Sequence, residues 1–382
     1  MSRITGVESF VLRTVEGGDI EEVFVVSISD AEGRSGIGES VAAPRALKAV
    51  LEMPRIHDWS QGIQAILLGA DPLEARALWD RLYDATFYHG RRGIAIHALS
   101  ALDMALHDLA GKQLGVPVYK LLGGARRDRI RPYATIFPGW PEDRSIDDLL
   151  EEIGRQVEAA RGLGFDALKL EVLFGDLVRD RGLVEIIRRT RQLAGDDCLF
   201  AVDFGYRWRD WEDARWVLSR IADCDLFFAE ATLRHDDLLG HAKLVAHCPM
   251  RIAGGELAAT RWEIRDWLEV AKVSVVQPSI ARAGGFTELC RIADLCDLYG
   301  ATVIPHGWAT GITDMANIHL QAASANMPLI EYRSPHLLPS VLRRDLVRPA
   351  DPPLTAGRFA LPEAPGLGIS LDRAVLARHL LP

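Results

Sequence analysis

Residues 167–174 read ALKLEVLF, a short apolar run that carries two charges. The run is typical of a buried strand, yet Lys169 and Glu171 stand within it, two residues apart. Side chains alternate along a strand, so both point to the same side. Because burying a charge without a partner costs free energy, the pair predicts a polar site on that side of the strand.

Apolar runs of this kind recur from residue 130 onward, separated by amphipathic stretches. They are IRPYATIF (130–137), ALKLEV (167–172), LFAVDF (199–204), LFFAEA (226–231), RIAGGE (251–256), VSVVQPSI (273–280), ATVIPHG (301–307) and LIEY (329–332). Strands that alternate with helices predict an α/β fold whose parallel sheet is covered by helices. Eight such strands favour a closed TIM barrel over an open sheet. The sequence also lacks the GxGxxG and GxxxxGK[ST] motifs of open nucleotide-binding sheets.

The regions before and after this alternation have a different pattern. Three strands in an antiparallel meander and one long helix are predicted by ITGVESFVLRT (4–14), EEVFVVSISD (21–30), SGIGES (35–40) and IAIHALSALDMALHDLAGKQLG (94–115). We therefore expect an α+β part over residues 1–128 and a barrel of eight strands and seven helices over 129–333. We expect residues 334–382 to return to the first part.

Composition excludes several classes of protein. The chain has 382 residues, 48% of them hydrophobic, and a net charge of −9, which argues against a nucleic-acid partner. No run of eighteen apolar residues is present, so we expect no membrane partner. The N-terminus lacks the apolar region of a signal peptide, and the five cysteines form no CxxC pair. These features predict a cytoplasmic protein.

Acidic residues end three consecutive predicted strands. Asp203, Glu230 and Glu256 are separated by 27 and 26 residues, about one strand–helix unit each. Three carboxylates at one barrel mouth would repel one another unless a cation neutralised them. Because all the donors are oxygen atoms, the set predicts Mg²⁺ or Mn²⁺. The alternative is that each carboxylate caps a helix or pairs with an arginine.

A histidine and a further glutamate end the last two predicted strands. His306, in IPHGW, is a candidate base because the pKa of histidine lies near neutrality. Its alternative role is that of a structural histidine at a strand end. Glu331 ends the eighth strand, in LIEY, and joins the candidate site.

Several motifs in this order resemble the mandelate racemase-like subgroup of the enolase superfamily, over nearly the whole chain. They are GIGES (36–40), SALDMALHDLAGKQLGVPVYKLLGG (100–124), VDF (202–204), AEA (229–231), AGGE (253–256) and PGLGISLD (365–372). The resemblance implies an α+β capping domain over a modified (βα)₇β TIM barrel. It also implies a homo-oligomer, and Mg²⁺ on Asp203, Glu230 and Glu256.

The same resemblance implies a reaction and roles for the site residues. A proton is abstracted from the carbon next to a substrate carboxylate, which gives an enediolate. Lys169 adds a second cation to that carboxylate. Glu331, if a raised pKa keeps it protonated, donates a hydrogen bond to it.

Departures from the subgroup pattern narrow the reaction. Glu171 replaces the second lysine of a Lys-x-Lys motif, Ser279 stands where an aspartate commonly orients the histidine, and Gly205 stands where asparagine is common. Loss of the second base disfavours a racemase. A dehydratase can work with His306 alone, which takes the α-proton and then protonates the leaving β-hydroxyl.

We therefore expect a Mg²⁺-dependent lyase that converts a small carboxylate, an aldonate or aldarate, to a 2-keto-3-deoxy acid. The alternatives are a sugar-lactone cycloisomerase, a racemase or epimerase that uses Glu171 as a base, and a non-catalytic metal-dependent binding protein. Glu171 contacts Lys169, a group around the metal ligands or a substrate hydroxyl, and the ion pair with Lys169 and the contact with substrate both remain open. Loops 14–22 and 42–62 are the expected specificity segments.

Overall fold

The N-terminal part is an antiparallel sheet with a long helix packed on it. The computed structural model describes residues 2–16, 19–350 and 352–381, so Gly17 and Gly18 of the expected specificity loop lie outside the described residues. Strands β1 (Ile4–Glu16), β2 (Asp19–Asp30) and β3 (Ser35–Ser40) pair in the order β1-β2-β3, and α5 (Ile94–Leu114) lies against them. The predicted meander and long helix are confirmed.

Two glycines of β3 allow this close packing. A Cβ atom on Gly36 would lie 2.0 Å from the carbonyl oxygen of Ala105, and one on Gly38 would lie 2.0 Å from that of Ala101. Any side chain would therefore push β3 away from α5, which explains both glycines of GIGES. Shorter elements complete this part: α1 (Pro44–Glu52), α2 (Gln64–Leu67), η1 (Pro72–Glu74), α3 (Ala75–Ala85), α4 (Phe87–Gly90) and α6 (Val118–Leu121).

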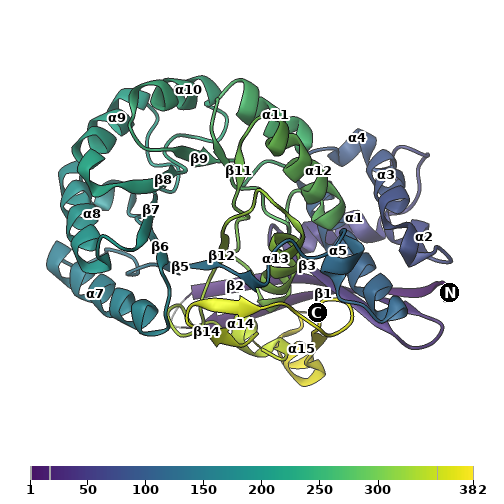
Figure 1. Cartoon of the computed structure of the whole chain (residues 1–382). Helices are drawn as coiled ribbons and strands as arrows, with labels where there is room; N and C mark the ends of the chain where they lie inside the picture. Colours follow the sequence, from purple (N-terminus) through teal and green to yellow (C-terminus); the bar gives the residue numbers. More distant parts are fainter. Residues whose placement is uncertain (1, 17–18, 351, 382) are drawn as a thin grey trace.

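The second part is a curled parallel sheet of the TIM type, seen as a ring with helices outside it (Figure 1). Its strands are β5 (Pro132–Ile136), β6 (Ala167–Glu171), β7 (Leu199–Asp203), β8 (Leu226–Glu230), β9 (Ile252–Gly254), β10 (Val275–Val276), β11 (Thr302–Val303) and β12 (Ile330–Tyr332). Each lies within one of the eight predicted runs. The order is β11-β10-β9-β8-β7-β6-β5-β12, so the edge strands are β11 and β12. Between them, the N–H of Glu331 donates to the carbonyl of Pro305 at 3.4 Å.

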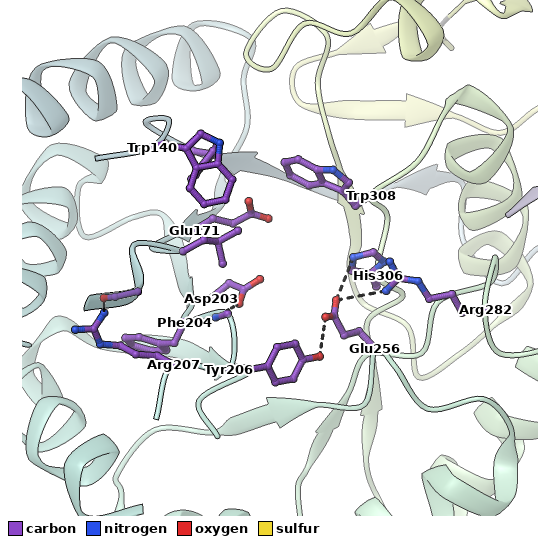
Figure 2. A pocket seen from close by; sticks show the side chains of 14 residues that line it. Trp140, Glu171, Asp203, Phe204, Tyr206, Arg207, Glu256, Arg282, His306 and Trp308 are labelled. Carbon is purple, nitrogen blue, oxygen red and sulfur yellow. Dashed lines mark hydrogen bonds and ion pairs between the residues drawn. The ribbon is translucent and has the colours of Figure 1, made fainter. Parts of the chain in front are cut away.

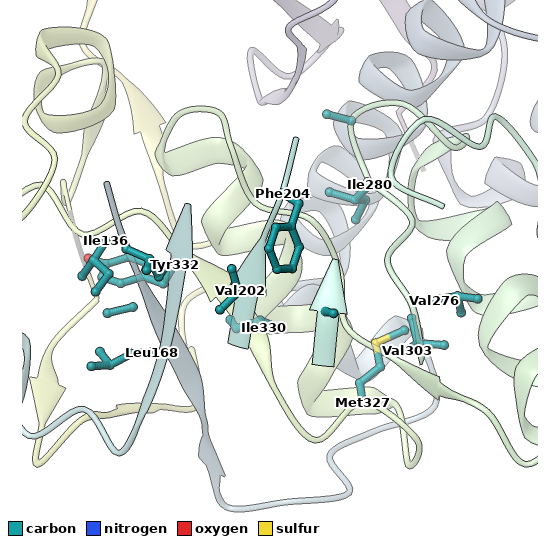
Figure 3. Close-up of a cluster of buried hydrophobic side chains, with 14 of the residues drawn as sticks. Ile136, Leu168, Val202, Phe204, Val276, Ile280, Val303, Met327, Ile330 and Tyr332 are labelled. Atoms are coloured by element: carbon teal, nitrogen blue, oxygen red, sulfur yellow. The ribbon is translucent and has the colours of Figure 1, made fainter. Parts of the chain in front are cut away.

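Seven helices alternate with these strands, as predicted. They are α7 (Ile146–Gly162), α8 (Asp180–Ala194), α9 (Trp211–Arg220), α10 (Leu238–His247), α11 (Arg261–Glu269), α12 (Gly285–Leu298) and α13 (Gly311–Ala323), with the 3₁₀ turns η2 (Gly175–Leu177) and η3 (Ala222–Cys224). Buried side chains such as Val202, Phe204 and Ile330 form part of the main core (Figure 3).

A separate apolar cluster closes the ring below the site. Tyr133, Phe228, Val275 and Ile304 belong to this cluster, and all four are buried. The ring is therefore a packed core rather than a pore, and polar side chains at the carboxyl ends of the strands lie above it.

The C-terminal segment contacts the N-terminal part. It contains α14 (Val341–Asp345), β13 (Val347–Arg348), β14 (Leu354–Thr355), β15 (Arg358–Ala360), β16 (Ser370–Leu371) and α15 (Arg373–His379), and β15 pairs with β4 (Arg129–Ile130). Asp108 of α5 accepts hydrogen bonds from the N–H groups of Ile37 (2.9 Å) and Leu367 (2.8 Å). This carboxylate thus joins β3, α5 and the C-terminal segment.

The N-terminal sheet also holds one end of a barrel helix. Glu39 of β3 accepts hydrogen bonds from the N–H groups of Thr310 (3.1 Å) and Thr313 (2.7 Å), at the start of α13. A carboxylate at this end satisfies N–H groups that have no partner within the helix. The contact positions the loop between β11 and α13, which carries His306. Across the described residues, no helix is long and apolar enough to cross a bilayer.

Candidate active site

All seven predicted site residues lie at the carboxyl end of the parallel sheet. Glu171, Asp203 and Glu230 end three neighbouring strands, in register with one another. Glu256 and His306 follow β9 and β11, and Glu331 lies within β12. A cavity of about 590 Å³ opens at this end, and its wall includes Glu171, Asp203, Glu256 and His306 (Figure 2).

Lys169 lies behind this cavity, among carboxylates. Its Nζ is 2.8 Å from Glu331 Oε1, 3.0 Å from Glu230 Oε2 and 3.6 Å from Asp203 Oδ2. Burial lowers the pKa of Lys169, but Glu230 and Glu331 raise it to well above its ordinary value. Lys169 is therefore a buried ammonium that neutralises the surrounding carboxylates. In this structure Lys169 does not line the cavity, and its expected contact with a substrate carboxylate stays a prediction.

Glu331 is surrounded by groups that favour its ionised form. It accepts hydrogen bonds from Thr135 Oγ1 and the N–H of Gly307, both at 2.8 Å, in addition to its contact with Lys169. Burial raises the pKa of Glu331, but Lys169 and His306 outweigh that effect and lower it to about 2. An ionised carboxylate only accepts hydrogen bonds, so a hydrogen bond from Glu331 to a substrate requires protonation of this group and stays a prediction.

Glu230 contacts two polar side chains. Gln277 Nε2 donates to Glu230 Oε2 at 2.6 Å, and the ammonium of Lys169 lies 3.0 Å from the same oxygen. Burial nevertheless raises the pKa of Glu230 well above its ordinary value. Sequence reasoning missed Gln277, although it stands in the QPSI string that ends a predicted strand.

Glu256 and His306 are in direct contact within the cavity wall. His306 Nε2 lies 3.1 Å from Glu256 Oε2, and Tyr206 Oη donates to Glu256 Oε1 at 2.6 Å. Burial raises the pKa of Glu256, but His306 and Arg282 leave it below its ordinary value. Burial lowers the pKa of His306 despite Glu256. The neutral imidazole that a base requires is therefore favoured.

The other ring nitrogen of His306 has no orienting anion. Nδ1 is buried and has no hydrogen-bond partner among the described residues. Ser279 pairs with His306 only through the backbone. This agrees with the expectation that Ser279 does not replace the missing aspartate.

Glu171 faces the cavity rather than Lys169. Within the described residues, its carboxylate makes no hydrogen bond and no ion pair, although 4% of the residue remains exposed. Burial raises the pKa of Glu171 well above its ordinary value, against the opposing effect of Lys169. The ion pair between Lys169 and Glu171, one of the two possibilities left open, is absent from this structure. Among the described residues, Glu171 is thus an unpaired carboxyl group in the cavity wall.

The three predicted metal ligands fit a hard cation by their chemistry. Burial raises the pKa of Asp203 to about 6, against the lowering effect of Lys169, so this carboxylate lacks sufficient positive charge nearby. Within residues 2–16, 19–350 and 352–381, no three acidic, histidine or cysteine side chains already converge as a metal site. Lys169 instead contacts Asp203 and Glu230, and His306 contacts Glu256. A cation would have to take over these contacts.

Aromatic side chains complete the cavity and were not predicted. Phe137, Trp140, Tyr206 and Trp308 line it, together with Arg282. Trp140 and Trp308 lie above Glu171 in Figure 2. The sequence signal for Trp308 was its place two residues after His306, on the same loop. Trp140 likewise lies in the loop that follows the first barrel strand, β5.

The fold is a TIM-type parallel sheet with an N-terminal capping domain, the architecture of the enolase superfamily, and membership of that superfamily implies a divalent metal ion. Residues 14–123 match the family described as "Mandelate racemase / muconate lactonizing enzyme, N-terminal domain", and residues 152–375 match "Enolase C-terminal domain-like". The chain belongs to the mandelate racemase/muconate lactonizing enzyme family of the enolase superfamily.

Relatives of known activity resemble the chain over nearly its full length. It is 31% identical to the arabinonate dehydratase of Saccharolobus solfataricus, over 94% of this chain and 90% of the relative. It is 30% identical to the D-galactarolactone cycloisomerase of Agrobacterium fabrum, over 94% and 91%. A crystal structure of a candidate racemase superposes with a TM-score of 0.93 and 40% identity, over 99% of this chain and 98% of the other.

Proposed function

We propose that the protein is a Mg²⁺-dependent acid-sugar dehydratase, in which Mn²⁺ can replace Mg²⁺. The observation that carries this proposal is the buried His306, which contacts Glu256 in the wall of a cavity that Glu171 and Asp203 also line. Its support from relatives is the similarity to arabinonate dehydratase. The substrate is an aldonate or aldarate. A cytoplasmic location and a homo-oligomeric state stay predictions.

His306 performs both proton transfers in this proposal. The neutral imidazole takes the proton from the carbon next to the substrate carboxylate, and the electron pair moves into that carboxylate to give an enediolate. The imidazolium then donates the same proton to the β-hydroxyl, the C–O bond breaks, and water leaves. The remaining enol becomes the 2-keto-3-deoxy acid. A buried histidine with a lowered pKa suits the first step, because its neutral form is available.

Asp203, Glu230 and Glu256 would hold the metal ion. Mg²⁺, when bound, supplies positive charge that stabilises the negative charge developing on the substrate carboxylate. Lys169 holds Glu230 and Glu331 beside that site through contacts of 2.8–3.0 Å, and it favours the ionised form of Glu331.

The test is incubation with Mg²⁺ and a library of acid sugars and their lactones in D₂O, followed by proton NMR. Loss of the α-proton together with a new 3-deoxy methylene signal supports the dehydratase. A lactone converted to a 3-deoxy acid identifies a cycloisomerase instead. Mg²⁺ binding with no change in any library member favours the non-catalytic binding protein.

A second candidate function, an isomerase, rests on Glu171. Its free carboxyl group shares the cavity with His306, so two proton-transfer groups are available to one ligand. The similarity to a cycloisomerase and to a candidate racemase agrees with this reading. Deuterium incorporation with formation of an epimer, and without elimination, would support it.

A further inference from the structure

A second cavity adjoins the first and is not used by the proposed chemistry. Its volume is about 610 Å³, and it shares Phe137, Trp140 and Trp308 with the first cavity. The two chambers are therefore adjacent, and both tryptophans border each of them. Each chamber alone lies within the range of about 300–1,000 Å³ that is usual for small-molecule sites. A sugar acid of six carbons in the first chamber leaves the second one free.

The charged groups of the second chamber are already paired. Arg333 Nη1 lies 2.9 Å from Glu21 Oε1, and the guanidinium of Arg333 stacks 4.6 Å from the ring centre of Trp308. Arg155 Nε donates to Glu152 Oε2 at 3.0 Å. Since each cation has its own carboxylate, the chamber offers no spare positive charge to a second carboxylate of the substrate.

The chamber is nevertheless suited to a polar ligand with apolar faces. Trp140 is 50% exposed although it borders both cavities, and Leu338 of the chamber wall is only partly buried. The C–H faces of a sugar ring pack well on an aromatic side chain, while its hydroxyls can reach the paired charged groups at the edge. A flat aromatic wall with a polar edge fits a sugar ring better than an alkyl chain.

We propose that this second chamber is a subsite for a neutral sugar ring attached to the acid sugar, so that the protein accepts glycosylated aldonates. The inference rests on the proposed function, because the aldonate end occupies the first chamber. The carboxylate lies near Asp203 and Glu256, and the attached ring passes Trp140 and Trp308. The ligand carries a single carboxylate.

The test is isothermal titration calorimetry of the Mg²⁺-loaded protein with a panel of hexonates and the C4-glycosylated form of each. At least one glycosylated hexonate should bind at least tenfold more tightly than its parent. Leu338→Trp, which fills the second chamber without touching the first, should reduce that gain to less than twofold. Leu193→Trp, an exposed leucine on α8, is the matched control and should keep the full gain.

A second variant tests the same chamber in case Leu338→Trp does not fold. Arg155→Ala changes only an exposed side chain of the same chamber and should reduce the gain about threefold. If no glycosylated hexonate binds more tightly than its parent while parents lose their α-proton in D₂O, this inference alone is wrong. If no hexonate of either kind binds or exchanges, the proposed function fails as well.

Discussion

The ammonium of Lys169 lies 2.8 Å from a carboxylate oxygen of Glu331, and both side chains are buried beneath the cavity. The two residues come from β6 and β12, which are separated in the ring by β5 alone. Their contact joins the second and the eighth barrel strands, which are far apart in the sequence. It also keeps Glu331 ionised, because Lys169 stabilises the charged form.

Lys169→Met should destabilise the metal-free protein by about 3–5 kcal/mol, because it leaves buried carboxylates without their cation. Urea unfolding followed by circular dichroism measures the loss. Lys243→Met, on an exposed position of α10, is the control and should change the unfolding free energy little. A loss below about 1 kcal/mol for Lys169→Met would show that the carboxylates find other partners.

His306→Asn should reduce α-proton exchange and turnover by about 10²–10⁴-fold, because no other imidazole lines the cavity among the described residues. Proton NMR in D₂O measures exchange, and calorimetry should still detect substrate. His247→Asn, on an exposed position of α10, should leave the rate unchanged. Full exchange by His306→Asn would assign the base to another residue.

Glu171→Gln should stabilise the metal-free protein by about 1–3 kcal/mol at pH 8, because it removes a buried carboxylate that has no partner. Thermal and urea unfolding measure the gain, with the exposed Glu151→Gln as control. The same variant separates the two candidate reactions. A dehydratase should keep α-proton exchange within about tenfold, whereas an epimerase that uses Glu171 should lose exchange for one epimer.

Asp203→Asn should weaken Mg²⁺ binding by at least about tenfold, and chelation of the metal should abolish turnover of the natural protein. Calorimetric titration with Mg²⁺ and with Mn²⁺ measures both affinities. Asp210→Asn is a control, since Asp210 lies in the loop that precedes α9 and only caps this helix. Unchanged Mg²⁺ affinity in Asp203→Asn would remove Asp203 from the proposed ligand set.

Protonation of His319 should account for part of the loss of folding stability at acidic pH. Burial lowers the pKa of His319 from 6.5 to about 4, so the unfolded chain binds a proton at a higher pH than the folded chain. The contribution of His319 to the free energy of unfolding is therefore complete above pH 6.5 and is lost as the pH falls toward 4. At pH 4.5 the loss is about 2–3 kcal/mol relative to pH 7.

His319→Gln keeps an acceptor for the N–H of Tyr119, which donates to His319 Nδ1 at 3.2 Å. This variant should therefore lose about 2–3 kcal/mol less than the natural protein between pH 7 and pH 4.5. Urea unfolding at both pH values measures the difference. An equal loss in the two proteins would show that His319 does not titrate in this range.

Much of the fold was predictable because its signals are local. Each barrel strand lies inside a short apolar run, and the phase of those runs placed Asp203, Glu230 and Glu256 at one end of the sheet. The two glycines of GIGES had no such signal. Their reason is the close approach of α5, which follows them by more than fifty residues.

The strand–helix alternation, the family resemblance and the residues at the carboxyl end of the sheet could all be predicted before the fold was known. These features depend on residue type and on spacing along one chain. Other features became visible only in the folded chain. Lys169 contacts Glu331 rather than Glu171. Gln277 donates to Glu230, Tyr206 donates to Glu256, and a second chamber adjoins the first. These features depend on distances between side chains of different strands. Such distances, and the pKa values that follow from them, arise only when the ring of strands closes.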